Sequence, residues 1–159
     1  ALAQVIAGQA HSQYRQVTVI DHHGRTAHFS GAHTLGLHAA QSGEQCVAAG
    51  NMLADAGVID AMVRAFERAP GQLAERLLAA LHAGQASGGE AGPVHSAALV
   101  VVDDLLWPIV NLRVDWADED PIGALDQLWQ AYRGQLQDYI DRAINPQHAP
   151  GYAVPGDDR

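Results

Sequence analysis

The sequence contains no lysine, so its nine basic side chains other than histidine are all arginines. Mechanisms that need an amine side chain, such as a Schiff base or a Ser-Lys dyad, must therefore take that amine from outside these residues. It has a single cysteine, Cys46, which excludes an internal disulfide. Because Cys46 lies in an apolar run, we expect it to be a small core residue. A nucleophilic thiol stays open as the alternative.

Positive charge and long apolar runs are also scarce. Eighteen acidic residues give a net charge of −9, which repels nucleic acid and anionic membrane surfaces. The apolar runs, such as Ala97 to Val102, are too short to cross a bilayer, and no basic segment followed by an apolar stretch opens the chain. We therefore expect a cytoplasmic protein with no nucleic-acid or membrane partner.

With 48% hydrophobic and 17% charged residues, the 159-residue chain has the composition of one globular domain. We expect this domain to cover residues 1–144, and residues 145–159 to form a tail on the surface or on a neighbouring subunit. The chain opens inside an amphipathic segment, Ala1 to Ala7, which Gly8 is expected to end in a left-handed conformation. We interpret it as a fragment with a companion N-terminal segment of the same polypeptide.

Alternating and helical patterns predict the elements in order. Residues 15–21 and 25–30 are expected to form two antiparallel strands around a turn at Gly24. The stretch that follows, residues 31–43, is expected to be a loop. Helices are expected from the apolar spacing after Val58, and again with Leu73, Leu77, Leu78 and Leu81 on a buried side up to Gly84. Two more strands, 96–102 and 109–116, precede one long amphipathic helix from Pro121 to about residue 144.

The stretch from Gln45 to Leu53 is the first candidate for a site. It is an apolar run with small residues that ends at Gly50-Asn51, where a strand is expected to give way to a helix. Asn51 would then place an amide at the end of a sheet. The alternative is that Asn51 only caps the following helix.

Two further patterns leave both a structural and a functional interpretation open. Asn111, Arg113 and Asp115 share one face of a strand, which is either solvated or lines a site. The chain has nine histidines, five of them between positions 22 and 38, which could hold zinc or another divalent ion, although their spacing matches no known ligand pattern. Solvated loop histidines are the alternative, and we expect no metal or cofactor.

From Tyr14 to Asp115 the chain resembles the DUF1028 family, a bacterial and archaeal family of unknown function placed with the N-terminal nucleophile (Ntn) hydrolases by fold. The residues that carry the resemblance are Val19-Ile20-Asp21, Gly24-Arg25, Phe29-Ser30-Gly31, Ala49-Gly50-Asn51-Met52-Leu53, Leu73 to Leu81, Gly88-Gly89-Glu90, Ser96-Ala97-Ala98-Leu99 and Leu112-Arg113-Val114-Asp115. The resemblance implies an α+β fold, an αββα sandwich of antiparallel sheets with outer helices. It also implies that the first strands are missing from this chain.

The resemblance further implies hydrolysis of an amide bond in a small-molecule or peptide-like substrate. An Ntn hydrolase uses an N-terminal Thr, Ser or Cys, whereas this chain begins with Ala1, so the nucleophile would lie outside the fragment. Asn51 would help to form an oxyanion hole, and the substrate would be positioned by Ser30, Gly50, Glu90, Ser96, Arg113 and Asp115. The loop after Gly89 reads Glu90-Ala91-Gly92-Pro93 and lacks the arginines usual in the family, which argues against anion binding there.

A second hypothesis is a non-catalytic small-molecule-binding or assembly module on the same scaffold. Trp129, Tyr132 and Tyr139 on long helix faces, together with the proline-containing tail, suit contacts between subunits. We expect a homo-oligomer under either hypothesis.

Overall fold

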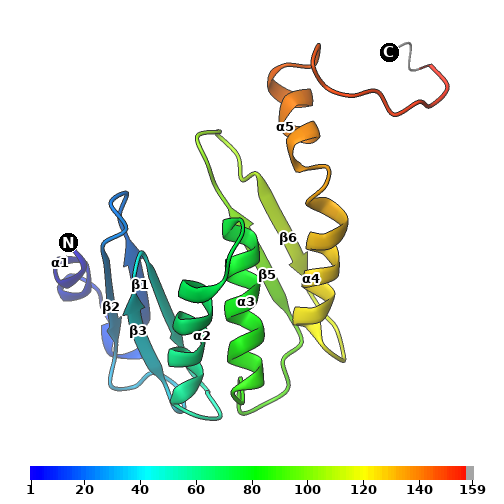
Figure 1. The fold of residues 1–159 in the computed structure, drawn as a ribbon. Helices are drawn as coiled ribbons and strands as arrows, with labels where there is room; N and C mark the ends of the chain where they lie inside the picture. The colour runs from blue at the N-terminus through cyan, green and yellow to red at the C-terminus, as the bar shows by residue number, and fades with distance from the viewer. Residues whose placement is uncertain (157–159) are drawn as a thin grey trace. The chain divides into compact units, whose positions relative to one another are not determined.

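A computed structural model describes residues 1–156 of the chain, and Figure 1 shows its helices and strands. The fold is mixed α+β, with antiparallel strand pairs and helices. The chain divides into two compact units, Ala1–Val94 and His95–Arg159. This division falls inside the range 1–144. Among the described residues, no helix is both long and apolar enough to cross a membrane.

The first unit contains a hairpin formed by β1 (Gln16–Ile20) and β2 (Thr26–Ser30), as the sequence predicts. The register pairs Gln16 with Ser30 at one end and Ile20 with Thr26 at the other. Asp21 organises the turn, because its Oδ1 accepts hydrogen bonds from the backbone N–H groups of His23 and Arg25, each at 2.9 Å. Gly24 supplies the positive φ of 75° that the turn requires.

A second hairpin pairs β3 (Ala39–Gly43) with β4 (Cys46–Gly50). The prediction that residues 31–43 are loop throughout is therefore wrong for β3. This strand has no β-branched or aromatic residue, so propensity does not reveal it. Its small residues suit a crowded position instead, since a Cβ added at Gly43 would lie 2.5 Å from Val63 Cγ1 of the neighbouring helix.

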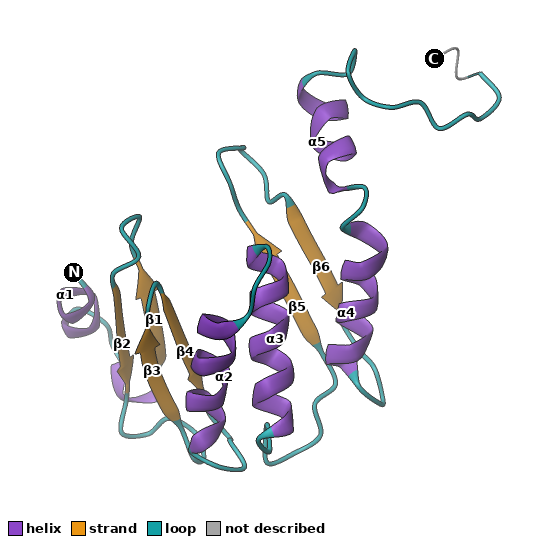
Figure 2. Cartoon of the chain, viewed as in Figure 1, coloured by secondary structure: helices purple, strands orange, loops and turns teal. Residues whose placement is uncertain are grey.

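The two hairpins lie against each other, β1 near β4 and β2 near β3 (Figure 2). Hydrogen bonds join them, including one from Thr26 Oγ1 to Ser42 Oγ at 2.8 Å. On the other side of the second hairpin lies α2 (Gly57–Arg68), which packs against α3 (Leu73–Ala86), while α1 (Leu2–Ala7) contacts β2. The first unit is therefore layered as helix, hairpin, hairpin and helix pair.

The core of the first unit lies along α2 and α3. Its buried side chains include Val58, Ile59, Val63 and Phe66 from α2 and Ala74 and Leu78 from α3. The prediction that Leu73 is buried is wrong, because this residue is the first of α3 and is 45% exposed. α3 also continues two residues beyond Gly84. Gly8 ends α1 with a right-handed φ of −88° rather than a left-handed one.

The second unit pairs β5 (Ala97–Val101) with β6 (Val110–Val114), and α4 (Pro121–Tyr132) packs on this hairpin. Both strands were predicted. Asp120 caps α4 by accepting a hydrogen bond from the Gly123 N–H at 2.9 Å. The core of this unit consists of buried apolar side chains from both strands and α4: Leu99, Val101, Val110, Ile122, Leu125 and Trp129.

The single helix predicted from Pro121 to residue 144 is in fact two helices. α4 ends at Tyr132 and α5 runs from Leu136 to Ile144, so the apolar spacing spans a break that contains Gly134. Beyond α5, Arg142 ties the following segment back to the helix, since its Nη1 donates to the Tyr152 hydroxyl at 2.9 Å and its guanidinium stacks on the Tyr152 ring. Ala149 is the one buried residue of this described segment.

Candidate functional site

The end of the first unit where β1 begins and β4 ends is built around the side chain of Gln16. Its Nε2 lies 3.0 Å from Ser30 Oγ and 3.2 Å from each of the carbonyl oxygens of Ala39 and Gly50. One half-buried amide therefore contacts both hairpins. It brings together two predicted site residues, Ser30 and Gly50, which are twenty positions apart in the chain.

Asn51 follows this junction directly, and its side chain is exposed. Its Nδ2 donates to the Leu35 carbonyl at 3.3 Å. The alternative that Asn51 caps the next helix is wrong, because α2 begins only at Gly57. The unusual backbone dihedral also lies one residue later than the Gly-Asn pair suggested, at Met52, with φ of 54°.

Glu90 lies beside the same turn. The Ala91 N–H donates to the Met52 carbonyl at 2.7 Å, the Ala54 N–H donates to the Gly89 carbonyl at 3.0 Å, and Glu90 pairs with Leu53 across this bridge. The Met52 N–H in turn donates to the Leu35 carbonyl at 3.1 Å. One end of the first unit thus gathers four predicted site residues in a continuous hydrogen-bonded frame. They are Ser30, Gly50, Asn51 and Glu90.

This frame offers polar groups with spare hydrogen-bonding capacity. A primary amide carries two N–H donors, and the bond to Leu35 uses one of those of Asn51. Ser30 Oγ accepts from Gln16, so its hydroxyl proton remains available for donation. Each of these two side chains can therefore donate one hydrogen bond to a ligand that reaches it.

The remaining predicted residues, Ser96, Arg113 and Asp115, belong to the second unit. Arg113 donates to Asp115 Oδ1, from Nε at 3.1 Å and from Nη2 at 2.5 Å. Both side chains are largely exposed, 66% and 76% respectively, and such an ion pair contributes little stability. In this pair Arg113 is already engaged by the carboxylate of the residue that directly follows its strand. Ser96 is exposed immediately before β5.

Cys46 is half-buried at the start of β4. Burial raises the pKa of its thiol, and the nearby charge of Glu67 raises the pKa further. Because the thiolate is the reactive form, both effects disfavour nucleophilic attack. They speak against the alternative of a nucleophilic thiol, while Cys46 itself is half-buried and is not one of the fully buried core residues.

The histidine-rich region does not gather into a metal-ligand set. In residues 1–156, no group of three or more His, Cys, Asp or Glu side chains is arranged to hold a metal ion. Instead, several rings lie against each other, His22 on His23 with centroids 3.8 Å apart and Tyr14 on His33 with centroids 5.0 Å apart.

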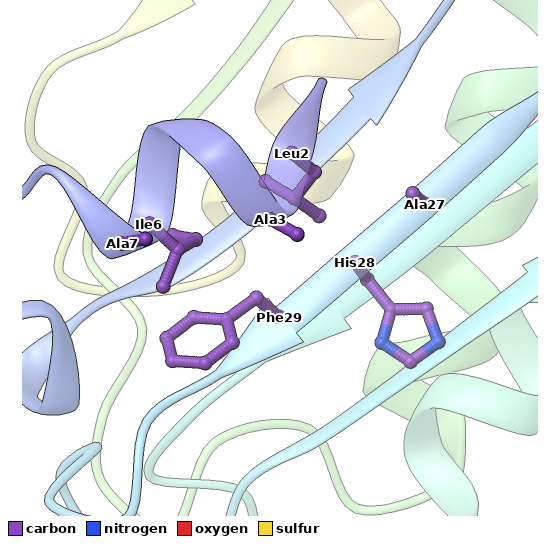
Figure 3. Close-up of a pocket in the computed structure, with 7 residues that line it drawn as sticks. All are labelled: Leu2, Ala3, Ile6, Ala7, Ala27, His28 and Phe29. Carbon is purple, nitrogen blue, oxygen red and sulfur yellow. The ribbon is translucent and has the colours of Figure 1, made fainter.

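An open apolar pocket of about 470 Å³ lies between α1 and β2. Figure 3 shows Ile6 of α1 near Phe29 of β2, with the His28 ring directed away from the helix. Its lining also includes Leu2, Ala3, Ala7 and Ala27. None of these residues is a predicted site residue, and the lining carries little polar chemistry.

Sequence reasoning missed Gln16 and the Leu35 carbonyl. A glutamine at the start of a β-rich segment gives no signal of its own, because its three acceptors come from positions 30, 39 and 50. The placement of Asn51 beside Leu35 depends equally on the fold. The one available signal was the Gly50-Asn51 pair at a strand end.

Comparison with known proteins identifies relatives of this chain. The model of the family of unknown function DUF1028 matches residues 1–125. The crystal structure of protein SPO2555 from Silicibacter pomeroyi, a DUF1028 protein, is 34% identical, with a TM-score of 0.78. The alignment covers 87% of this chain and 59% of that one, so the chain spans less than two thirds of its neighbour's length. No curated protein matches. With a family match over most of its length and a neighbour of the same family, the chain belongs to the DUF1028 family.

Proposed function

We propose that this chain is part of an amide-bond hydrolase of the Ntn type that acts on a small-molecule or peptide-like substrate. The layered first unit then represents part of an αββα sandwich, and the attacking hydroxyl or thiol comes from outside these 159 residues. Its oxygen or sulfur adds to the amide carbonyl carbon, the carbonyl oxygen gains negative charge, and the amine leaves with a proton. Water then releases the acyl group.

The observation that carries the proposal is the frame at the end of the first unit. Asn51 has a second N–H donor beyond its bond to Leu35, and donors aimed at developing oxyanions are a major source of rate enhancement. Gln16 holds Ser30 and Gly50 in the same frame, which is the kind of support that keeps a site in one geometry. Glu90 lies beside this frame, where it pairs with Leu53 in a β-bridge.

The test is a panel of acyl amides with chromogenic amine leaving groups, assayed with the polypeptide that contains this chain together with the segment that supplies the nucleophile. Asn51→Ala is expected to lower kcat about 10²- to 10³-fold, the loss seen when one oxyanion-hole donor is removed. Asn145→Ala is the matched control, because Asn145 belongs to the second unit and is exposed. A wild-type protein that hydrolyses none of the amides would reject the proposal, and full activity of Asn51→Ala would remove Asn51 from it.

The origin of the nucleophile has its own test. Intact mass and N-terminal sequencing of the purified protein are expected to reveal a segment that begins with Thr, Ser or Cys. Substitution of that residue by Ala should abolish amide hydrolysis. If amides are hydrolysed equally well without such a residue, the Ntn mechanism is wrong.

A second candidate function, a non-catalytic binding or assembly module, is favoured by α5. None of its residues is buried, and Tyr139 and Ile144 are 48% and 55% exposed. Apolar helix faces of this kind are common in subunit contacts. Under this hypothesis the protein is a homo-oligomer whose mass in light scattering falls in a Tyr139→Ser/Ile144→Ser variant. A monomeric wild type would contradict assembly through α5.

A further inference from the structure

We propose that Trp116, in the second unit, forms a recognition site for an organic cation presented by a basic peptide segment of another protein. This inference is independent of hydrolase activity. It rests on a tryptophan that is exposed but held in place by its neighbours, and on the charge that surrounds it.

Trp116 is 68% exposed, although two contacts fix the orientation of its indole. One ring face stacks on the imidazole of His95, with centroids 4.1 Å apart and planes inclined by only 8°. The indole Nε1–H donates to Asp118 Oδ1 at 3.0 Å. Because one face is covered and the N–H is satisfied, a cation that binds the indole would lie on the opposite face of the ring.

The imidazole beneath the indole is itself held in place. His95 Nδ1 lies 2.9 Å from the Ala117 carbonyl oxygen, and because a carbonyl only accepts, Nδ1 must be the donor. A backbone hydrogen bond joins the same two residues, because the Ala117 N–H donates to the His95 carbonyl at 2.7 Å. Binding on the open face of Trp116 would therefore cost little side-chain conformational entropy, and preordered aromatic groups of this kind are frequent binding hot spots.

The charges around Trp116 select the ligand. Asp115, Asp118, Glu119 and Asp120 lie within four positions of it in the chain, and all four are exposed. Arg113 neutralises Asp115 only. An indole face carries negative electrostatic potential and attracts cations, and the nearby carboxylates add to that attraction while repelling carboxylate or phosphate ligands.

Among organic cations, a peptide carrying several arginines or lysines fits this surface best. A guanidinium can stack on the indole plane while its N–H groups reach carboxylate oxygens. Neighbouring basic residues of the same peptide can meet the other carboxylates, so several contacts add on one chain. A free cation could make the first contact only.

The test follows the indole N–H resonances of the three tryptophans by NMR. A hexa-arginine peptide is titrated against the protein, with hexa-glutamate and arginine amide as separate arms. The Trp116 resonance is expected to shift saturably with hexa-arginine, to remain unchanged with hexa-glutamate, and to need a much higher concentration of arginine amide. High salt should weaken the peptide binding.

Variants then separate the indole from the general negative charge. Trp116→Ala is expected to weaken hexa-arginine binding about tenfold, the loss expected for a cation–π contact supported by charge, and Trp116→Phe is expected to retain part of it. Trp107→Ala is the matched control, because Trp107 is also exposed, at 41%, and should bind the peptide like the wild type. Circular dichroism checks that each variant folds.

Three outcomes would overturn the proposal. Equal binding by the wild type and Trp116→Ala would mean that hexa-arginine responds only to the negative surface. Equal loss in Trp107→Ala would mean that no particular indole is recognised. Saturation by arginine amide at the concentration needed for the peptide would make a free cation, and not a peptide partner, the occupant.

Discussion

Helices α2 and α5 separate apolar from polar residues about equally sharply, yet they end in opposite environments. α2 buries Val58, Ile59, Val63 and Phe66 against β3, β4 and α3. α5 buries no residue, and the Ile144 side chain at its end is 55% exposed. An amphipathic pattern therefore shows that a helix has an apolar side, and the rest of the fold decides whether anything covers that side.

The largest effect is expected from truncating an isoleucine of α2, in contrast with the same change in α5. Ile59 is 1% exposed, so Ile59→Ala should lower the free energy of unfolding by about 2–5 kcal/mol, through lost burial and a residual cavity. Ile144→Ala should change it by less than about 0.5 kcal/mol. Urea denaturation measures both. Equal losses would mean that α5 is covered in solution, most simply by a second copy of the chain.

The next largest effect on stability is expected at Gln16, which joins two hairpins, compared with Gln137, which bonds within one helix. Gln16→Ala removes donors from three acceptors and should cost about 1–3 kcal/mol, because the half-buried Gly50 and Ala39 carbonyls each lose one hydrogen bond. Gln137 only reaches Asp141 one turn along α5, so Gln137→Ala should cost less than about 0.5 kcal/mol. A similar cost for the two substitutions would show that Gln16 does not hold the hairpins together.

A gain in stability is expected at the break between α4 and α5. Gly134 does not have a positive φ, and a Cβ added there would meet nothing within 4 Å. Gly134→Ala should therefore raise stability by about 0.4–1 kcal/mol, mainly by restricting the unfolded chain. Thermal unfolding monitored at 222 nm tests this, and a lower midpoint would mean that the break itself is required.

The smallest effect is a pH dependence at the exposed β1–β2 turn. The hydrogen bond from the Arg25 side chain holds the pKa of Asp21 below its usual 3.8, although its partial desolvation opposes the shift. The contribution of the ionised Asp21 carboxylate to folding stability is therefore complete above about pH 4. It is lost as the pH falls through the lower pKa that Asp21 has in the folded state. The Asp21 carboxyl carbon shift, followed by NMR, should titrate below that of an unfolded peptide. The Arg25→Gln variant should remove most of the difference.

Local patterns predicted the elements whose residues carry their own signal. The turn at Gly24, the apolar spacing of α2 and the Asp120-Pro121 start of α4 all depend on neighbours in sequence. β3 was missed because its small residues form a strand only when β4 and α2 pack around them. The end of α4 was missed because the apolar spacing continues through Gly134.

In the candidate site, too, residues with a local sequence signal were predicted and a residue placed by tertiary packing was not. Asn51 was found from a strand-end pattern, and its neighbours Ser30, Gly50 and Glu90 came from the family resemblance. Gln16 could not be found, since its role depends on acceptors from three other strands. Contacts set by tertiary packing leave no local trace in the sequence.

Each of the three ladders joins strands that follow one another directly along the chain. Short connections lose little entropy on closure, so these hairpins can form early and independently during folding. The contact between Gln16 and the Gly50 carbonyl, 34 positions apart, can form only when two finished hairpins dock. The slow step in the first unit should therefore be this docking, and Gln16→Ala should slow refolding more than any substitution within a single turn.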